Sequence, residues 1–489
     1  MCKIGSVMTL GVTGLLLLSL PVGALAHAAE PSPPARQIEG VWQGSLDVPG
    51  GTLRIVFHIE RAEDGTFAAT LDSPDQGATG IPVSSVALDG DSLRMEVAVI
   101  GGVYQGRLQP DGHTIDGVWT QGGMDVPLRL EHTDEAPPPP KRPQDPDEPV
   151  PYAVEEVRFE NAEAGITLAG TLTRPRTGGP HPAVVLVSGS GPQDRDEALA
   201  GHRPFLILAD YLTRRGIAVL RYDDRGVGAS TGTFTGATTE DFAADALAAV
   251  HYLAGRDGID AARIGIAGHS EGGLVAPMAA NRSEAVAFAV LLAGPGLPGR
   301  DILRMQGRLV LAAGGASEDA LAAYEALQLR LFAALDAEPG EAAADRIRAE
   351  ARAALAAMPP EIQAQLGFSQ LPEEALLTQF SALASPWMRF FLRYDPRPAL
   401  QQLRQPVLAL LGGKDLQVPA EENRAALEAA LQAGGHEDYA VVVLPGLNHL
   451  FQPAGTGAPT EYAQIETTMD EAALAAVADW ILDRFGHEE

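Results

Sequence analysis

The sequence predicts a small all-β domain followed by a larger α/β domain with a doubly wound, mostly parallel sheet. Three observations lead to this fold class. The chain has 489 residues, of which 46% are hydrophobic and 20% charged, so it can bury two cores and lacks the composition of a disordered chain. Its first third contains short alternating runs between glycine-rich turns. After a proline-rich stretch, apolar runs alternate with helical patterns rich in alanine and leucine.

The N-terminus has the pattern of a secretory signal peptide over residues 1–28. Lys3 precedes an apolar run from Ile4 to Leu20, and small residues that suit cleavage after residue 26 or 28 follow. An uncleaved membrane anchor is the alternative. The single cysteine, Cys2, lies inside the signal, so the mature chain would have no thiol and no disulfide. We expect an exported protein, periplasmic or extracellular, with no stable membrane insertion after cleavage.

Residues 38–132 are predicted to form the small antiparallel β domain. Asp-Gly and Gly-Gly pairs between the runs supply the positive-φ positions that hairpin turns need. We expect an up-and-down barrel or a half-open sandwich of seven or eight strands, without catalytic residues. The expected strands are Gly40–Leu46, Thr52–Ile59, Thr66–Leu71, Ser92–Val97, Tyr104–Leu108, Thr114–Trp119 and Val126–Leu130.

A linker separates this domain from the next. Residues 133–151 contain a run of four prolines and further prolines among Asp and Glu, which predicts an extended, solvated spacer. Residues 152–489 predict the α/β domain. Its expected strands are Ile166–Thr173, Ala183–Val187, Ile217–Arg221, Arg263–Ala267, Ala287–Leu292, Val407–Leu411 and Val441–Leu444.

The sequence predicts two helical regions of the α/β domain. A crossover helix is expected from Thr239 to Leu253, because Thr238 and Asp241 have the spacing of a capping box and apolar residues recur on one face. Residues 301–394 contain helical patterns and no expected strand, and they predict a helical cap inserted before the strand at Val407.

The charge of the chain excludes one class of partner. Lys and Arg number 35 against 64 Asp and Glu, which gives a formal net charge of −29, and no basic stripe offsets it. The resulting field would repel phosphate backbones and anionic lipid headgroups. We therefore expect no nucleic-acid partner.

A G-x-S-x-G pattern at Gly268–Gly272 is the strongest catalytic signal. It follows the expected strand Arg263–Ala267 and precedes a run that suits a helix, which is the strand–turn–helix context of a nucleophile elbow. Small residues at both ends of the pattern permit a tight turn that presents a hydroxyl above the sheet, beside the positive end of the helix. Ser270 is therefore the predicted nucleophile.

A serine hydroxyl needs a base, and the base needs a carboxylate that orients it. Asp415 and His449 follow Ser270 in the chain, each on a loop after an expected strand. These loops fall at the carboxyl edge of the sheet, where ligands bind in such folds. We predict the order Ser270, Asp415, His449 as a catalytic triad. Alternatives for the acid are Glu421, Glu422 and Asp301.

The oxyanion of the reaction needs backbone N–H donors from two places. The first is the N–H of Glu271, directly after the nucleophile. The second is expected on the loop after the strand Ala183–Val187, from Ser190 or from Gly191. Further along this loop, Asp194 and Arg195 are expected to pin the loop by an ion pair, and a place on the rim of the site, together with Gly191, is the alternative. His269 is predicted to be a packing residue.

The remaining motifs predict no metal site and no cofactor. The mature histidines lack metal-ligand spacing. Gly294–Gly299 matches G-x-G-x-x-G, but its prolines remove N–H donors and no early βαβ unit frames it, so we expect a loop that leads into the cap. The glycine-rich turn Asp224–Ser230 is expected to be scaffolding beside the site rather than a nucleotide-binding loop.

Together these motifs resemble the α/β-hydrolase superfamily over about residues 152–489. The patterns S-G-S-G-P-x-D-R-D, D-x-R-G-x-G-x-S and G-H-S-E-G-G are similar to exported bacterial esterases of that superfamily, a group also described as serine aminopeptidase-like. The resemblance implies an eight-stranded sheet, a helical cap between the sixth and seventh strands, and the triad roles given above. The oxyanion loop departs from the family, because it begins with Ser188 where a histidine is frequent. The β domain lies outside the resemblance.

The predicted function is that of a metal-free serine carboxylesterase for small or medium acyl esters. The alternatives are a serine aminopeptidase, a thioesterase or an acyltransferase with the same triad, and a catalytically silent binding protein. The expected partner is a small-molecule ester or a short peptide. The natural substrate, the oligomeric state and the role of the β domain are not readable from the sequence.

Overall fold

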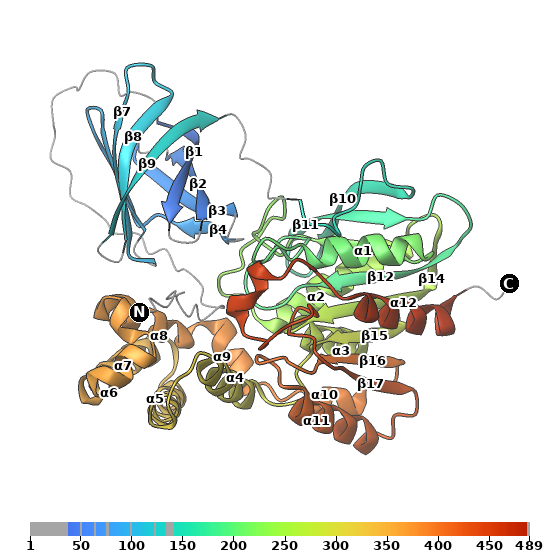
Figure 1. Cartoon of the computed structure of the whole chain (residues 1–489). Helices are drawn as coiled ribbons and strands as arrows, with labels where there is room; N and C mark the ends of the chain where they lie inside the picture. Colours follow the sequence, from blue (N-terminus) through green and yellow to red (C-terminus); the bar gives the residue numbers. More distant parts are fainter. Residues whose placement is uncertain are drawn as a thin grey trace.

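The computed structural model describes residues 38–48, 51–62, 65–74, 78–97, 100–121, 124–133 and 141–486. It contains two sheets, one in each predicted domain (Figure 1). The predicted signal peptide, residues 1–28, lies outside the described residues.

The N-terminal sheet is an antiparallel meander in which the first and last strands pair with each other. Its strand order is β4-β3-β2-β1-β9-β8-β7-β6-β5, so the barrel-like sheet has its two edges at β4 and β5. The strands are β1 Gly40–Val48, β2 Gly51–Arg61, β3 Phe67–Ser73, β4 Ala78–Pro82, β5 Ser85–Asp89, β6 Ser92–Val97, β7 Gly102–Leu108, β8 Thr114–Gln121 and β9 Met124–Thr133.

Inward-facing residues of this sheet form a core of their own. Trp42, Phe57, Tyr104 and Trp119 are all buried in it. The sheet has nine strands, so the expected number of seven or eight is wrong. The two unpredicted strands, β4 and β5, have five residues each, and the alternation of Val86 and Leu88 in β5 is too short to mark a strand in the sequence.

The second sheet has eight strands in the order β10-β11-β13-β12-β14-β15-β16-β17. The first two pairings, β10 with β11 and β11 with β13, are antiparallel, and the other pairings are parallel. The strands are β10 Ala153–Asn161, β11 Ile166–Arg174, β12 His181–Val187, β13 Ala218–Tyr222, β14 Ile259–His269, β15 Phe288–Leu292, β16 Val407–Gly412 and β17 Tyr439–Leu444.

Helices cover both faces of this sheet (Figure 1). The core beneath α2, α3, α10 and α11 lies on one face, and the core beneath α1 and α12 lies on the other. The helices outside the cap are α1 Pro204–Arg214, α2 Thr239–Ala254, α3 Gly272–Arg282, α10 Arg397–Gln402, α11 Ala420–Ala433 and α12 Glu471–Phe485. The predicted capping box of α2, Thr238 with Asp241, is present.

The cap lies between the sixth and seventh strands of the sheet, β15 and β16. Its helices are α4 Gly299–Ala313, α5 Glu318–Ala337, α6 Gly340–Ala357, α7 Pro360–Gln365, α8 Glu373–Ser381 and α9 Pro386–Arg393. The strand order, the helices on both faces and the position of the cap confirm the predicted α/β-hydrolase fold. Strand β10 was not expected, because it is an edge strand whose exposed positions are mostly charged.

The second half of the predicted linker is bound to the α/β domain. The Arg142 guanidinium donates to the carbonyls of Ala200, Gly201, Ala463 and Ile465 at 3.1–3.2 Å. Further contacts join Gln144 to Thr468 and Met469, and Asp145 to Arg203. Residues 141–151 are therefore not a solvated spacer. Their proline and charge content is typical of one, but their partners lie far away in the sequence.

A matched pair of fragments tests this boundary. A fragment that begins at Lys141 is expected to fold and to keep its hydrolytic activity, since the candidate site and the cap follow it. A fragment that begins at Tyr152 lacks the Arg142 and Asp145 contacts and leaves their partners unpaired, so we expect a lower thermal midpoint. Equal midpoints would show that residues 141–151 contribute nothing. An insoluble or inactive longer fragment would place part of the core or site on the β domain.

Candidate active site

Ser270 occupies the tight turn between β14 and α3. Its φ is +51°, in the left-handed region that a residue with a side chain rarely adopts. The turn is held by the Ser270 N–H, which donates to the carbonyl of Leu292 at 2.8 Å, and by the Ser270 carbonyl, which accepts from Gly273 at 2.9 Å. Strain of this kind is typical of a nucleophile elbow.

The glycines at both ends of the turn are required by close packing. A Cβ at position 268 would lie 1.9 Å from the carbonyl oxygen of Gly272. A Cβ at position 272 would lie 2.3 Å from the carbonyl oxygen of Val187, at the end of β12. Both distances are shorter than the contacts that real Cβ atoms make. Glycine is therefore needed at position 268 for the turn to close and at position 272 for the turn to pack against β12.

Asp415 and His449 meet at the carboxyl edge of the sheet, each on the loop after its strand. The Nδ1 atom of His449 lies 2.7 Å from Oδ2 of Asp415, and both side chains are buried. The other carboxylate oxygen of Asp415 accepts the N–H groups of Gln417 at 2.7 Å and Val418 at 2.9 Å. The carboxylate is thus fixed in orientation and presents one free oxygen to the imidazole.

The two loops that carry this pair are bonded to each other. The Lys414 N–H donates to the carbonyl of Leu447, and the Lys414 ammonium donates to the carbonyls of Ala454 and Gly455 at 2.6 and 2.8 Å. Asn448 is fully buried and its Oδ1 accepts the N–H groups of Leu450 and Gln452, which fixes the backbone around His449. The alternative acids do not take part: Glu421 and Glu422 are exposed in the first turn of α11, and Asp301 lies in α4 of the cap.

The oxyanion loop after β12 lies against the nucleophile. A Cβ on Gly189 would be 3.2 Å from the Cβ of Ser270. The Gly189 N–H is already used, since it donates to Glu197 at 2.7 Å. Within the described part of the chain, the N–H groups of Ser190, Gly191 and Glu271 donate to no protein acceptor. The expected donors therefore remain available, and both Ser190 and Gly191 stay open for the second position.

The side chain of Glu271 connects the elbow to the cap. Its Oε1 accepts the hydroxyl of Thr239, at the start of α2, at 2.6 Å and the indole N–H of Trp387, in α9, at 2.8 Å. Burial raises the pKa of the Glu271 carboxyl, although these two donors and the side chain of Ser190 oppose the rise. Oε2 is buried and finds no partner among the described residues.

His269 is more than the predicted packing residue, because both of its ring nitrogens face oxygen atoms. Nδ1 lies 2.8 Å from Oε1 of Glu197, and Nε2 lies 3.0 Å from the carbonyl oxygen of His449. Sequence reasoning missed Glu197 entirely. It directly follows the S-G-S-G-P-x-D-R-D pattern, but it is 72 residues from His269 and nothing in the pattern specifies that partner, so only the folded chain shows the pair.

Arg195 and Asp194 hold the oxyanion loop in place. Arg195 forms a two-pronged ion pair with Asp223, at 3.0 and 2.8 Å, and also contacts Glu156. Asp194 accepts the N–H groups of Asp196 and Ala198, and thus closes a turn. These contacts match the expectation that an ion pair pins the loop.

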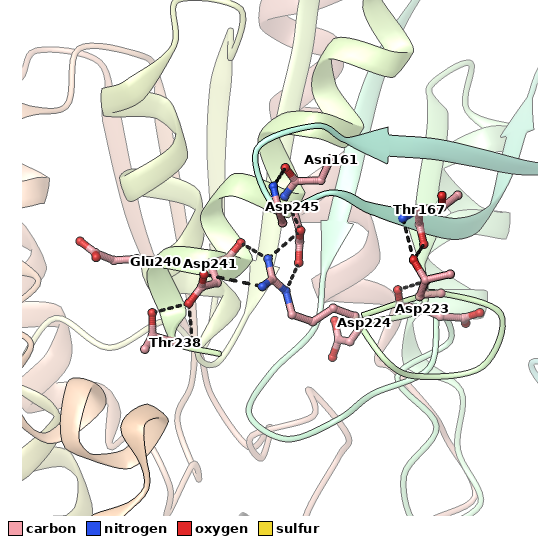
Figure 2. Close-up of polar contacts among 12 residues, drawn as sticks. Asn161, Thr167, Asp223, Asp224, Thr238, Glu240, Asp241 and Asp245 are labelled. Carbon is pink, nitrogen blue, oxygen red and sulfur yellow. Dashed lines mark hydrogen bonds and ion pairs between the residues drawn. The ribbon is translucent and has the colours of Figure 1, made fainter. Parts of the chain in front are cut away.

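The glycine-rich turn after β13 is also tied down by its own side chains. Arg225 donates to Asp245 at 2.7 and 2.9 Å, and Asp245 accepts a third bond from Asn161 at 2.6 Å (Figure 2). Asp224 accepts from the hydroxyl of Ser188 at 3.0 Å, so the turn supports the start of the oxyanion loop. Its side-chain partners are protein groups, as expected for scaffolding.

The described residues contain neither a cluster of metal ligands nor a membrane-spanning helix. Over residues 38–486, apart from the gaps stated above, there is no group of three His, Cys, Asp or Glu side chains arranged to hold a metal ion. In the same described segments, no helix is both long enough and apolar enough to cross a membrane.

Comparison with known proteins gives one family match and several relatives. The family model described as X-Pro dipeptidyl-peptidase (S15 family) matches residues 164–446, more than half of the chain. Esterase EstD from Thermotoga maritima is 28% identical over 339 residues, which cover 68% of this chain and 70% of EstD.

Two solved structures are also similar in fold. An esterase from Pyrococcus furiosus is 17% identical with a TM-score of 0.43, and the match covers 69% of this chain and 92% of that one. The α/β hydrolase GrgF from Penicillium sp. sh18 is 19% identical with a TM-score of 0.43, over 68% of this chain and all of GrgF. The extent of the family match decides the assignment: the chain is a hydrolase that belongs to the X-Pro dipeptidyl-peptidase (S15) family.

Proposed function

We propose that this hydrolase cleaves carboxylic esters of small or medium acyl chains through Ser270, His449 and Asp415. The observation that supports the proposal most strongly is the left-handed Ser270 turn on the same sheet edge as the buried Asp415–His449 pair. His269, the neighbour of Ser270, has its ring centroid 4.7 Å from that of His449, so the two loops are in contact.

The chemistry follows from the orientation of the imidazole. Asp415 accepts the Nδ1 proton of His449, which leaves Nε2 free to take the proton of the Ser270 hydroxyl. The alkoxide attacks the ester carbonyl, and the N–H groups of Glu271 and of Ser190 or Gly191 stabilise the oxyanion. His449 then donates its proton to the leaving alcohol. A water molecule releases the acyl group by the same steps.

The ion pairs of the cap favour ester substrates over substrates with a free amine, because they occupy carboxylates that could otherwise bind an ammonium group. A peptidase that recognises a free N-terminus must pair the substrate ammonium with a carboxylate, because an unpaired buried cation is costly. Many cap carboxylates are already paired with arginines near the surface, as in the contacts Glu325–Arg304, Glu350–Arg330, Glu374–Arg348 and Asp336–Arg300. The relative named an esterase, EstD, supports the same substrate class.

The second candidate is an aminopeptidase or dipeptidyl-peptidase with the same triad. Two observations favour it: the family match and the buried Oε2 of Glu271, next to the nucleophile, which has no partner among the described residues. A carboxylate in this place could pair with a substrate ammonium. The indole of Trp387 bonds to the other oxygen, Oε1, and would hold the carboxylate in place from the cap.

Parallel kinetics on two substrate series decide between these candidates. We expect kcat/KM for short p-nitrophenyl esters to exceed that for aminoacyl- and X-Pro-naphthylamides, after correction for leaving-group reactivity. The Glu271→Gln variant is the matched control, because it removes the negative charge while keeping the size of the side chain. A preference for free-amine peptides that is lost on N-acetylation, and lost again in Glu271→Gln, would establish the peptidase instead.

A further inference from the structure

Glu197 is a buried carboxylate that joins three parts of the candidate site. It is 3% exposed, and its Oε1 accepts the N–H of Gly189 on the oxyanion loop at 2.7 Å. The same oxygen lies 2.8 Å from Nδ1 of His269, on the nucleophile elbow. His269 continues the chain of contacts, because its Nε2 lies 3.0 Å from the carbonyl oxygen of His449.

The backbone holds Glu197 in this place at a cost. Its φ is +51°, a left-handed conformation that is unfavourable for a residue with a side chain. The Glu197 N–H donates to the carbonyl of Asp194 at 3.0 Å, which closes the turn. The strained turn fixes the buried Glu197 carboxylate next to the nucleophile elbow.

The geometry limits the protonation states in which both contacts of His269 are hydrogen bonds. Both ring nitrogens of His269 face oxygen atoms, and a neutral imidazole has one N–H. Both contacts are hydrogen bonds when His269 is an imidazolium beside ionised Glu197, or when neutral His269 faces protonated Glu197. In either arrangement the pair carries one proton more than a neutral imidazole with a carboxylate.

The electrostatics favour the imidazolium form. Burial by itself would lower the pKa of His269, but the charge and hydrogen bond of Glu197 and the carbonyl of His449 outweigh burial and raise it. The ionisable groups that act on this ring are Glu197, His449 and Asp415, and Asp194 lies near Glu197.

We propose that Glu197 and His269 form a second, proton-sharing pair that positions the oxyanion loop and the His449 backbone relative to Ser270. The inference rests on the proposed function of that site. Glu197 and His269 are positioning residues, since they act through Gly189 and His449 and not on the substrate. One carboxylate then sets the spacing between the oxyanion donors, the nucleophile and the base.

A glutamine at position 197 cannot replace the carboxylate. If its oxygen accepts from Gly189 and from Nδ1 of His269, the ring is neutral and its Nε2 loses the bond to His449. If its amide nitrogen instead takes the place of Oε1 and donates to Nδ1 of His269, the Gly189 N–H loses its acceptor, because the amide oxygen then lies at the other position. Glu197→Gln therefore loses at least one of the three contacts while nearly preserving the volume of the side chain.

Kinetics on p-nitrophenyl esters test the positioning role. We expect Glu197→Gln to lower kcat by about a hundredfold to a thousandfold, the range found when one oxyanion donor is removed, with KM nearly unchanged. His269→Gln should show a similar loss, and the double variant should be no worse than either single one, because the two residues act as a unit. Asp210→Asn, which removes a carboxylate bonded to Tyr152 and Arg214, is the control that should keep its kcat.

Nitrogen-15 NMR of histidine-labelled protein tests the shared proton without relying on activity. The ring signals of His269 are assigned by their disappearance in His269→Gln. We expect both ring nitrogens of the wild type to be protonated at neutral pH, and one of them to be deprotonated in Glu197→Gln. Full activity in Glu197→Gln, or a neutral His269 beside an ionised Glu197 in the wild type, would overturn this inference and leave the proposed function intact. A wild type that neither hydrolyses esters nor reacts with a fluorophosphonate would overturn both.

Discussion

Replacing Ser270 with alanine is expected to lower kcat by about a millionfold while the fold stays intact. The change removes one hydroxyl oxygen from a side chain on a turn whose backbone contacts, to Leu292 and from Gly273, involve no side-chain atom. Without the oxygen no acyl-enzyme can form, so the remaining rate reflects binding and the oxyanion donors alone.

Steady-state kinetics on a p-nitrophenyl ester, with circular dichroism to confirm the fold, provide the measurement. Ser283→Ala is the matched control. Ser283 caps the C-terminal end of α3, so the change removes a serine hydroxyl next to the same helix without altering the elbow at its N-terminal end. We expect it to keep the wild-type kcat. Residual activity above a few per cent in Ser270→Ala would mean that another residue is the nucleophile.

Asp415→Asn is expected to lower kcat by about ten-thousandfold, by analogy with the same change in the trypsin triad. The structure supplies the reason. The N–H groups of Gln417 and Val418 point at Oδ1, so the amide must place its oxygen there and turn its NH₂ group toward Nδ1 of His449. The imidazole then carries its proton on Nε2, where it can no longer accept the proton of Ser270.

The exposed acid Glu421 provides the comparison for this variant. Glu421→Gln removes a carboxylate that the sequence left open as an alternative orienting acid, and the structure places it in the first turn of α11. We expect wild-type kcat for Glu421→Gln. An Asp415→Asn variant that keeps its activity, together with a Glu421→Gln variant that loses it, would assign the orienting role to the other acid.

Local sequence determines the parts of this molecule that were predictable. The elbow could be predicted because its tight turn leaves no room for a Cβ at position 268 or at position 272. Glycine is therefore required at both ends, and the whole pattern lies within five consecutive residues. The capping box of α2 is local in the same way, with Thr238 and Asp241 three positions apart. The largely buried strands of the sheet's centre were also visible, because uniform burial produces continuous apolar runs.

Features that depend on distant contacts or exposed edges were not predictable. Strands β5 and β10 have mostly polar or charged side chains on their exposed positions, so neither presents a strong apolar pattern. Arg142 bonds to a carbonyl 323 residues away, so nothing in the linker itself indicates that it is docked. The Glu197–His269 pair is of the same kind, since neither residue stands in a motif that specifies the other.

Covalent labelling of Ser270 tests the central claim most directly, namely that Ser270 is a nucleophile activated by the Asp415–His449 pair. Wild-type protein treated with a fluorophosphonate should gain the mass of one phosphonyl group, mapped by peptide mass spectrometry to Ser270. The labelling rate should fall steeply in Asp415→Asn and stay unchanged in Glu421→Gln. A wild type that gains no adduct, or that is inactivated by an adduct on a different residue, would contradict the account.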